Sequence, residues 1–114
     1  MEAALSKWPI SPVGKLCVDI GASTGGFTEV LLSRGARHVI ALDVGHGQLH
    51  PSLDADVRVT RCDGVNIRDV NRQWWDGVSG EAPELIVVDV SFVSLTHVFP
   101  PAVALWPEAE WIAL

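Results

Sequence analysis

The chain has 114 residues, a formal net charge of −6 and 48% hydrophobic residues. This length suits one domain with a sizeable core, and the hydrophobic content argues against wholesale disorder. The acidic balance excludes nucleic-acid binding by bulk electrostatics alone, although a local basic face is still compatible with it. No apolar run reaches the ~18 residues of a membrane span, and we expect neither a signal peptide nor a membrane partner.

Apolar periodicity predicts strands that alternate with helices along the chain. A short helix is expected over residues 1–8, and the first strand, Leu16–Ile20, leads into a glycine-rich turn. Further strands are expected over residues 38–42, 57–62, 85–89 and 111–114. Further helices are expected over residues 27–34, 48–53, the segment between Asn66 and Asp76, and 95–106. The two cysteines, Cys17 and Cys62, fall inside strands and are expected to be buried free thiols.

This alternation predicts an α/β fold with a parallel sheet. Right-handed crossovers with one reversal give the strand order 3-2-1-4-5, which is Rossmann-like. Strands one and four are then neighbours, so Gly21 and Asp89, at their carboxyl ends, are expected to share one crevice. The fifth strand leaves a bare apolar edge at the end of the chain. We therefore expect a domain truncated after strand five, with a missing segment or a dimer partner covering that edge.

The stretch Asp19–Phe27 predicts a ligand site, because a strand, a tight glycine turn and a helix N-terminus follow one another in it. A dinucleotide loop has a second glycine where this chain has Ser23. The Asp19 carboxylate would repel a pyrophosphate and attract the ammonium and sulfonium of S-adenosylmethionine. Both observations favour S-adenosylmethionine over NAD. The alternatives are a turn that holds no ligand and, for Asp19, a hydrogen bond that merely orders the loop.

Two further acids follow the second and third strands. Asp43 lies near the ~20-residue offset from Gly21 that is typical of an acid holding ribose hydroxyls. Its alternative role is to cap the turn that follows. Asp63, at the end of the third strand, is of a type that is common in turns.

Three segments carry a resemblance to a known family: Asp19–Glu29, Asp43–Leu49 and Asp89–Leu95. Their residues, order and spacing resemble the TlyA family of hemolysin A-like ribosomal RNA 2′-O-methyltransferases, whose catalytic domain is FtsJ-like. The resemblance covers nearly the whole chain. His46 stands where the family usually has Tyr.

The resemblance implies that S-adenosylmethionine donates a methyl group to a ribose 2′-hydroxyl of ribosomal RNA, with ribosomal subunits as partners in the cytoplasm. Asp89 would be the acid of the family's Lys-Asp-Lys-Glu catalytic set, in which a lysine orients the hydroxyl and acids hold that lysine. No metal is expected. The cofactor-binding residues implied are Asp19, Gly21, Ser23, Gly25, Gly26, Phe27, Asp43, Val44 and Asp63.

The chain departs from the family in its catalytic set, because only Asp89 of the four residues maps onto it. The family's basic RNA-binding domain does not map either. We therefore expect residues 1–114 to be a partial FtsJ-like domain. The alternatives are a truncated, catalytically silent cofactor-binding or RNA-associated module and a fragment of an NAD-type oxidoreductase.

Two groups of side chains invite an interpretation as RNA contacts. The tryptophans are expected to pack in the core, with Trp75 and Trp106 as the candidates for exposure. The arginines near strand three are expected to form either a basic edge or an ordinary solvated face. They are Arg58, Arg61, Arg68 and Arg72.

Overall fold

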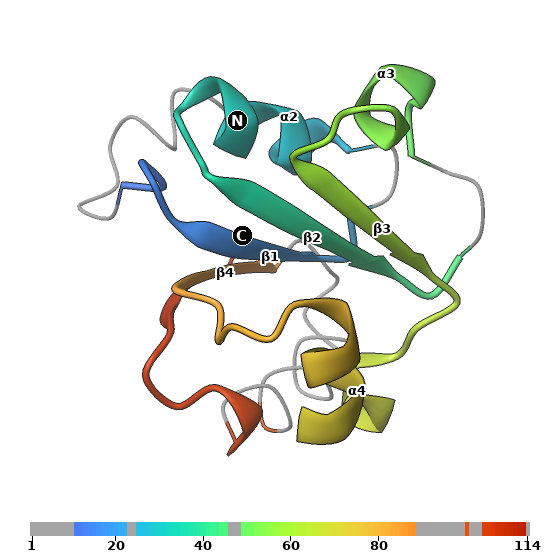
Figure 1. Cartoon of the computed structure of the whole chain (residues 1–114), viewed down its shortest axis with the longest axis vertical. Helices are drawn as coiled ribbons and strands as arrows, with labels where there is room; N and C mark the ends of the chain where they lie inside the picture. Colours follow the sequence, from blue (N-terminus) through green and yellow to red (C-terminus); the bar gives the residue numbers. More distant parts are fainter. Residues whose placement is uncertain (1–10, 23–24, 46–48, 89–99, 101–103, 114) are drawn as a thin grey trace.

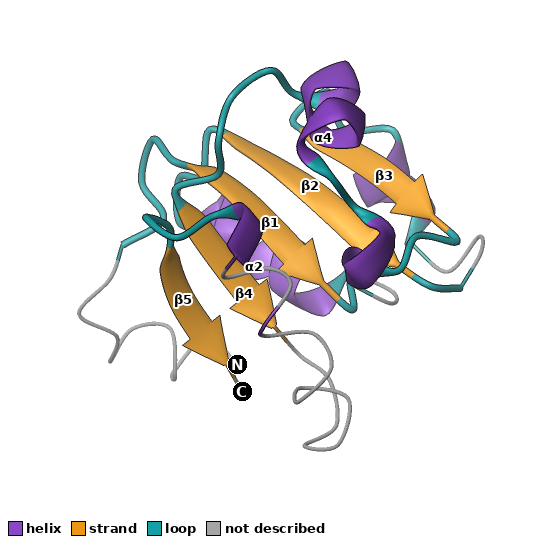
Figure 2. Cartoon of the chain, turned by 90° about the horizontal axis from the view of Figure 1, so that it is seen from below, coloured by secondary structure: helices purple, strands orange, loops and turns teal. Residues whose placement is uncertain are grey.

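The computed structural model describes residues 11–22, 25–45, 49–88, 100 and 104–113. In these residues five strands form one sheet in the order β3-β2-β1-β4-β5, and every neighbouring pair is parallel (Figures 1 and 2). The predicted order, including the reversal at β1, is confirmed. The strands are β1 (Leu16–Ile20), β2 (His38–Asp43), β3 (Val59–Asp63), β4 (Leu85–Val88) and β5 (Glu110–Ala113).

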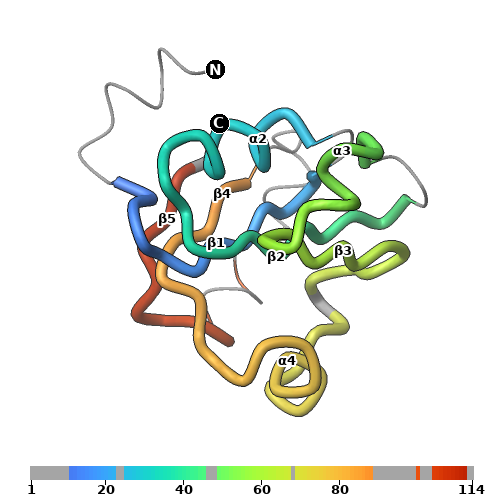
Figure 3. The backbone as a smooth tube through the Cα atoms, turned by 45° about the horizontal axis from the view of Figure 1, so that its top comes forward, coloured from blue at the N-terminus to red at the C-terminus, as the bar shows by residue number. Residues whose placement is uncertain are grey.

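Helices cover both faces of the sheet. Figure 1 shows α2 (Gly26–Ser33) and α3 (Pro51–Asp54) on one face and α4 (Arg72–Val78) on the other. The tube in Figure 3 shows the same layers from a second direction. Among the described residues, no helix is long and apolar enough to cross a membrane.

The core has two layers, because successive side chains of a strand point to opposite faces of the sheet. In β1, where all five residues are buried, Leu16, Val18 and Ile20 face the α4 side. Cys17 lies in the other layer, with residues of α2 and α3. Continuous burial of this kind is typical of a parallel strand covered on both faces. Both cysteines are free; Cys17 is buried, as predicted, and Cys62 is half-buried.

Two predicted boundaries are wrong for identifiable reasons. The third strand was expected from Val57, but β3 begins at Val59 and the Val57 side chain is 91% exposed. The helix expected over residues 48–53 begins only at Pro51, which has no amide hydrogen to lose and therefore suits the first helical position.

The helix expected after Asn66 is divided. A short 3-10 turn (Ile67–Asp69) comes first, and α4 then starts afresh after Asn71. The Asn71 side chain accepts a hydrogen bond from the Trp74 amide at 2.8 Å, which is a strong N-cap. This new start resets the helical register, so a different face of the helix meets the sheet.

The reset determines the tryptophan packing. Trp75 and Trp106 are 3% and 5% exposed, so these two candidates for exposure pack in the core, as the other tryptophans were expected to. Their rings pack edge to face with centroids 4.7 Å apart. The Trp75 indole NH donates to the Glu81 carbonyl, which satisfies its polar atom. Trp74 is half-buried against the same core, as predicted.

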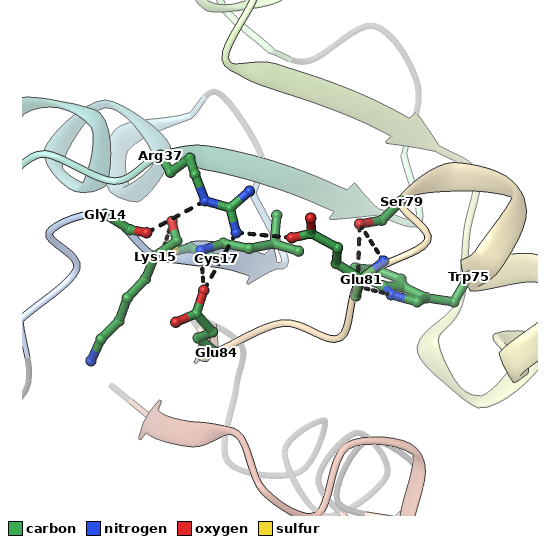
Figure 4. A network of polar contacts seen from close by, with 9 residues as sticks. Gly14, Lys15, Cys17, Arg37, Trp75, Ser79, Glu81 and Glu84 are labelled. Atoms are coloured by element: carbon green, nitrogen blue, oxygen red, sulfur yellow. Dashed lines mark hydrogen bonds and ion pairs between the residues drawn. The ribbon is translucent and has the colours of Figure 1, made fainter.

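A polar network joins the amino ends of the strands, at the edge opposite the expected site (Figure 4). Arg37 donates to Glu81 at 3.0 Å and to Glu84 at 3.4 Å, and its Nε reaches the Gly14 carbonyl. Glu84 in turn accepts from the Leu16 amide. These exposed ion pairs are each worth little, so we regard the network as a structural tie between β1 and β4.

Several sequence predictions lie outside the described residues. They are the helix over residues 1–8, most of the helix over 95–106, and the side chains of Ser23, His46, Arg68 and Asp89. Residues 104–105 are helical and β5 begins at Glu110, one residue before its predicted start.

Candidate functional site

The glycine turn lies against the end of β2. The amides of Gly21 and Ala22 both donate to the Leu42 carbonyl, at 2.9 and 3.1 Å. Gly21 has φ +80°, a conformation that glycine adopts without strain. Because Leu42 precedes Asp43, these two bonds hold the turn beside the carboxylate that ends β2.

Two features favour glycine at position 25. It is the N-cap of α2 with φ +100°, in the left-handed region. A Cβ atom there would overlap Leu53 Cδ1 and lie 2.7 Å from Leu49 Cδ1. The two buried leucines therefore pack directly on the turn backbone, and they join the loop after β2 to the loop after β1.

Asp19 lies inside the molecule. Its side chain is 0% exposed, and its Oδ2 accepts a hydrogen bond from the Thr28 hydroxyl at 2.8 Å. Thr28 is the third residue of α2 and is also 0% exposed. The carboxylate is thus held against the first turn of α2, directly behind the glycine turn. Thr28 was missed by the sequence reasoning, although its place one helical turn from the loop was a usable signal.

Asp43 sits where the glycine turn meets the sheet edge. Its Oδ1 accepts a hydrogen bond from the Gly45 amide at 2.8 Å, which shapes the loop after β2. The capping role considered from sequence is therefore present. A carboxylate has about four acceptor positions, so this bond leaves capacity for a ligand hydroxyl. Val44 follows with 68% of its side chain exposed, an apolar surface next to the acid.

Asp63 lies beside Asp43, because the two residues are partners in the β2–β3 pairing. Arg61 holds Asp63, with 3.3 Å between Arg61 Nε and Asp63 Oδ2. The same guanidinium contacts Asp54 Oδ2 at 3.1 Å. Sequence reasoning missed this role, although the two-residue spacing on one strand places both side chains on one face.

The basic edge considered from sequence is partly an ion-paired face. Arg58 pairs with Asp56 at 2.8 Å, and Arg61 pairs with Asp54 and Asp63 as described above.

Cys62 lies in β3 between Arg61 and Asp63, and burial together with the Asp63 charge raises the pKa of its thiol. The thiol is therefore protonated near neutral pH and is not an activated nucleophile.

The described part of the predicted site gathers at the carboxyl ends of β1, β2 and β3. Phe27 differs in that its half-buried ring packs against the core beneath α2. Val88 ends β4 beside Ile20 of β1, and Asp89 is the next residue in the sequence. Within the described residues, no group of three or more His, Cys, Asp or Glu side chains could hold a metal ion.

A doubly wound parallel sheet with a glycine turn after β1 and an acid at the end of β2 defines a Rossmann-like α/β domain. The sequence model of the FtsJ-like methyltransferase family matches residues 1–112. The chain belongs to this family, and the resemblance to TlyA and hemolysin A proteins is confirmed by the relatives below.

Over 100 residues the chain is 47% identical to "Hemolysin A" of Brachyspira hyodysenteriae, and this alignment covers 88% of the chain and 40% of the relative. Over 103 residues it is 48% identical to the "16S/23S rRNA (cytidine-2′-O)-methyltransferase TlyA" of Mycobacterium tuberculosis, covering 90% and 37%. The chain therefore spans less than half the length of these relatives.

Solved structures share the fold. A "putative hemolysin" of Streptococcus thermophilus superimposes with a TM-score of 0.81 and 38% identity, covering 91% of this chain and 37% of that chain. An S-adenosylmethionine dependent methyltransferase of Mesorhizobium loti has a TM-score of 0.68 and 15% identity, covering 97% and 50%. At that identity the second comparison concerns the fold alone.

Proposed function

We propose that the chain is the cofactor-binding part of a methyltransferase that transfers a methyl group from S-adenosylmethionine to a ribose 2′-hydroxyl of ribosomal RNA. Family membership supports the reaction class. The TlyA relative, named for cytidine-2′-O methylation of 16S and 23S rRNA, supports the substrate class and a cytoplasmic, ribosomal partner. The observation that carries the proposal is the docking of the glycine turn beside Asp43 through the Leu42 carbonyl.

The charges around the turn suit S-adenosylmethionine better than a dinucleotide. The buried Asp19 carboxylate lies behind the first turn of α2, where a pyrophosphate would otherwise bind. The stretch from residue 19 to residue 29 contains no lysine or arginine that could offset phosphate charge. A ligand with an ammonium and a sulfonium group meets an attractive field here, and a pyrophosphate meets a repulsive one.

Different residues of the candidate site would contact different parts of the ligand. Asp43 would hold the ribose hydroxyls, and Val44 and Asp63 would contact the adenine side. Gly21, Ser23, Gly25 and Gly26 would shape the methionine end together with the backbone of Phe27, whose ring packs against the core, and Asp19 would supply the negative charge behind it.

When bound, S-adenosylmethionine supplies an electrophilic methyl group on a positively charged sulfur. The chain's contribution is to fix that group and to present Asp89, which would hold a lysine that orients the attacking hydroxyl. Binding without catalysis is the alternative.

Calorimetry and a methyl-transfer assay test the proposal. The chain is titrated with S-adenosylmethionine and with NAD, and is then incubated with radiolabelled S-adenosylmethionine and ribosomal subunits. Digestion of the RNA and chromatography identify any 2′-O-methyl nucleoside. Transfer that is lost in Asp89→Ala supports the enzyme, and cofactor binding without transfer supports the silent module. Tighter binding of NAD than of S-adenosylmethionine overturns both.

A further inference from the structure

The pair formed by Asp19 and Thr28 stands out among the buried residues of the described chain. Among the described residues, Asp19 and Thr28 are the polar or charged residues that are buried, and each is 0% exposed. They join the middle of β1 to the first turn of α2 through a 2.8 Å hydrogen bond. Around them the layer between the sheet and α2 is apolar, with Cys17, Leu31 and Val39 in it.

A carboxylate in such a layer is costly unless it is hydrogen-bonded or used. The partners of Asp19 on the flanking strands, Ala41 and Val87, have apolar side chains that cannot hydrogen-bond the carboxylate. The helix above offers a reason for the charge. Gly25 has no side chain to cap α2, and the bond to Thr28 holds the carboxylate against the first turn of that helix, near its partly positive N-terminal end.

We propose that Thr28 is a positioning residue of the cofactor site, which holds the Asp19 carboxylate so that the pocket prefers the positively charged cofactor to its neutral product. This inference rests on the proposed function. The hydroxyl donates to one carboxylate oxygen and so fixes both the place and the charge of the group. Methyl transfer removes the positive charge from the sulfur, and with it the attraction to Asp19, which favours product release.

A purely structural pair would behave differently. If the hydrogen bond only fastened α2 to β1, its loss would lower stability and weaken both ligands alike. A positioning role predicts a change in the ratio of the two affinities. The two ligands, S-adenosylmethionine and S-adenosylhomocysteine, differ only in the methyl group and its charge, so this ratio isolates the electrostatic contribution.

Three variants separate these roles. Thr28→Val keeps the branched shape and removes the hydroxyl, whereas Thr28→Ser keeps the hydroxyl. Asp19→Asn keeps the shape of the acid and removes its charge. Each is measured by calorimetry with both ligands, and folding is checked by circular dichroism and thermal melting.

We expect Thr28→Val and Asp19→Asn to lower the preference for S-adenosylmethionine over S-adenosylhomocysteine roughly tenfold, the scale of one hydrogen bond to a charged group. Thr28→Ser should keep the preference within about twofold of the unsubstituted chain. An equal loss for both ligands, or no loss, in Thr28→Val overturns the proposal. If the variants fail to fold, the unsubstituted chain decides: equal affinity for the two ligands overturns the inference, and binding of neither overturns the proposed function instead.

Discussion

Asp43 and Asp63 are partners in the β2–β3 pairing, so two carboxylates end neighbouring strands at the same edge of the sheet. Like charges in directly opposed positions destabilise a sheet. Arg61 offsets this cost, because its guanidinium contacts Asp63 at 3.3 Å and Asp54 at 3.1 Å. The arginine thereby links the end of β3 to α3 and restricts where the Asp63 carboxylate can point.

The first prediction concerns this arginine. Arg61→Met should weaken S-adenosylmethionine binding by ~0.5–1 kcal/mol, the range of a partly exposed ion pair, because Asp63 loses its restraint. Asp54→Asn is the matched control, since it breaks only the outer contact of Arg61 and should leave the affinity unchanged. Calorimetry measures both variants. An equal loss in the two would show that Arg61 acts through α3 and not through Asp63.

Asp43 should contribute more than Arg61, because it is expected to contact the ligand directly. Asp43→Ala should weaken S-adenosylmethionine binding by ~1–3 kcal/mol, the scale of a charge-assisted hydrogen bond. Asp56→Ala is the control: it removes an acid that pairs with Arg58 at the other end of β3. Unchanged affinity in Asp43→Ala would remove Asp43 from the site and leave it as a turn-forming residue.

The sheet could be predicted because its strands are short apolar runs bounded by glycine turns. The bounds of β1 match the prediction residue for residue, and the alternation with helices left few topologies to consider. The place of the candidate site in the fold followed from the same reasoning, since the carboxyl ends of adjacent parallel strands meet at one edge of the sheet. The fit of Asp43 beside the glycine turn needed no knowledge of side-chain packing.

Helix registers could not be predicted in the same way. Trp74 and Trp75 are adjacent, so only one can face the sheet fully, and the choice depends on where α4 starts. Asn71 decides this through its cap, but Asn66 offered an equally good cap in the sequence.

The complete burial of Asp19 could not be predicted either, because an acid near a strand end usually points to solvent. Only its shared face with Cys17 indicated that it turns toward α2.

Gly25 and Gly77 provide a matched pair for testing the turn. Gly25→Ala should destabilise the fold by ~1–3 kcal/mol, because φ +100° strains an alanine and its Cβ overlaps Leu53. Gly77 lies in α4 with nothing within 4 Å of an added Cβ, so Gly77→Ala should be neutral or stabilise by ~0.5–1 kcal/mol. Urea unfolding measures both. Similar effects would mean that the leucines move aside easily and do not constrain the turn.

The two cysteines should differ in their response to pH. Burial raises the pKa of Cys17 from 9.0 to about 12, whereas Cys62, whose pKa is also raised, is only half-buried. A thiol-reactive probe at pH 8 should therefore label Cys62 first and Cys17 only as fast as the fold opens.

The buried thiol should also make stability depend on pH. In the unfolded chain Cys17 loses its proton from pH 9 upward, but in the folded chain it keeps the proton to higher pH. The contribution of Cys17 to the free energy of unfolding is thus fully present below pH 9 and is lost as the pH rises toward 12. In urea titrations, Cys17→Ala should therefore lose less stability at alkaline pH than the unsubstituted chain. Rapid labelling of Cys17 in the folded chain would show that the layer beneath α2 admits solvent, contrary to its complete burial.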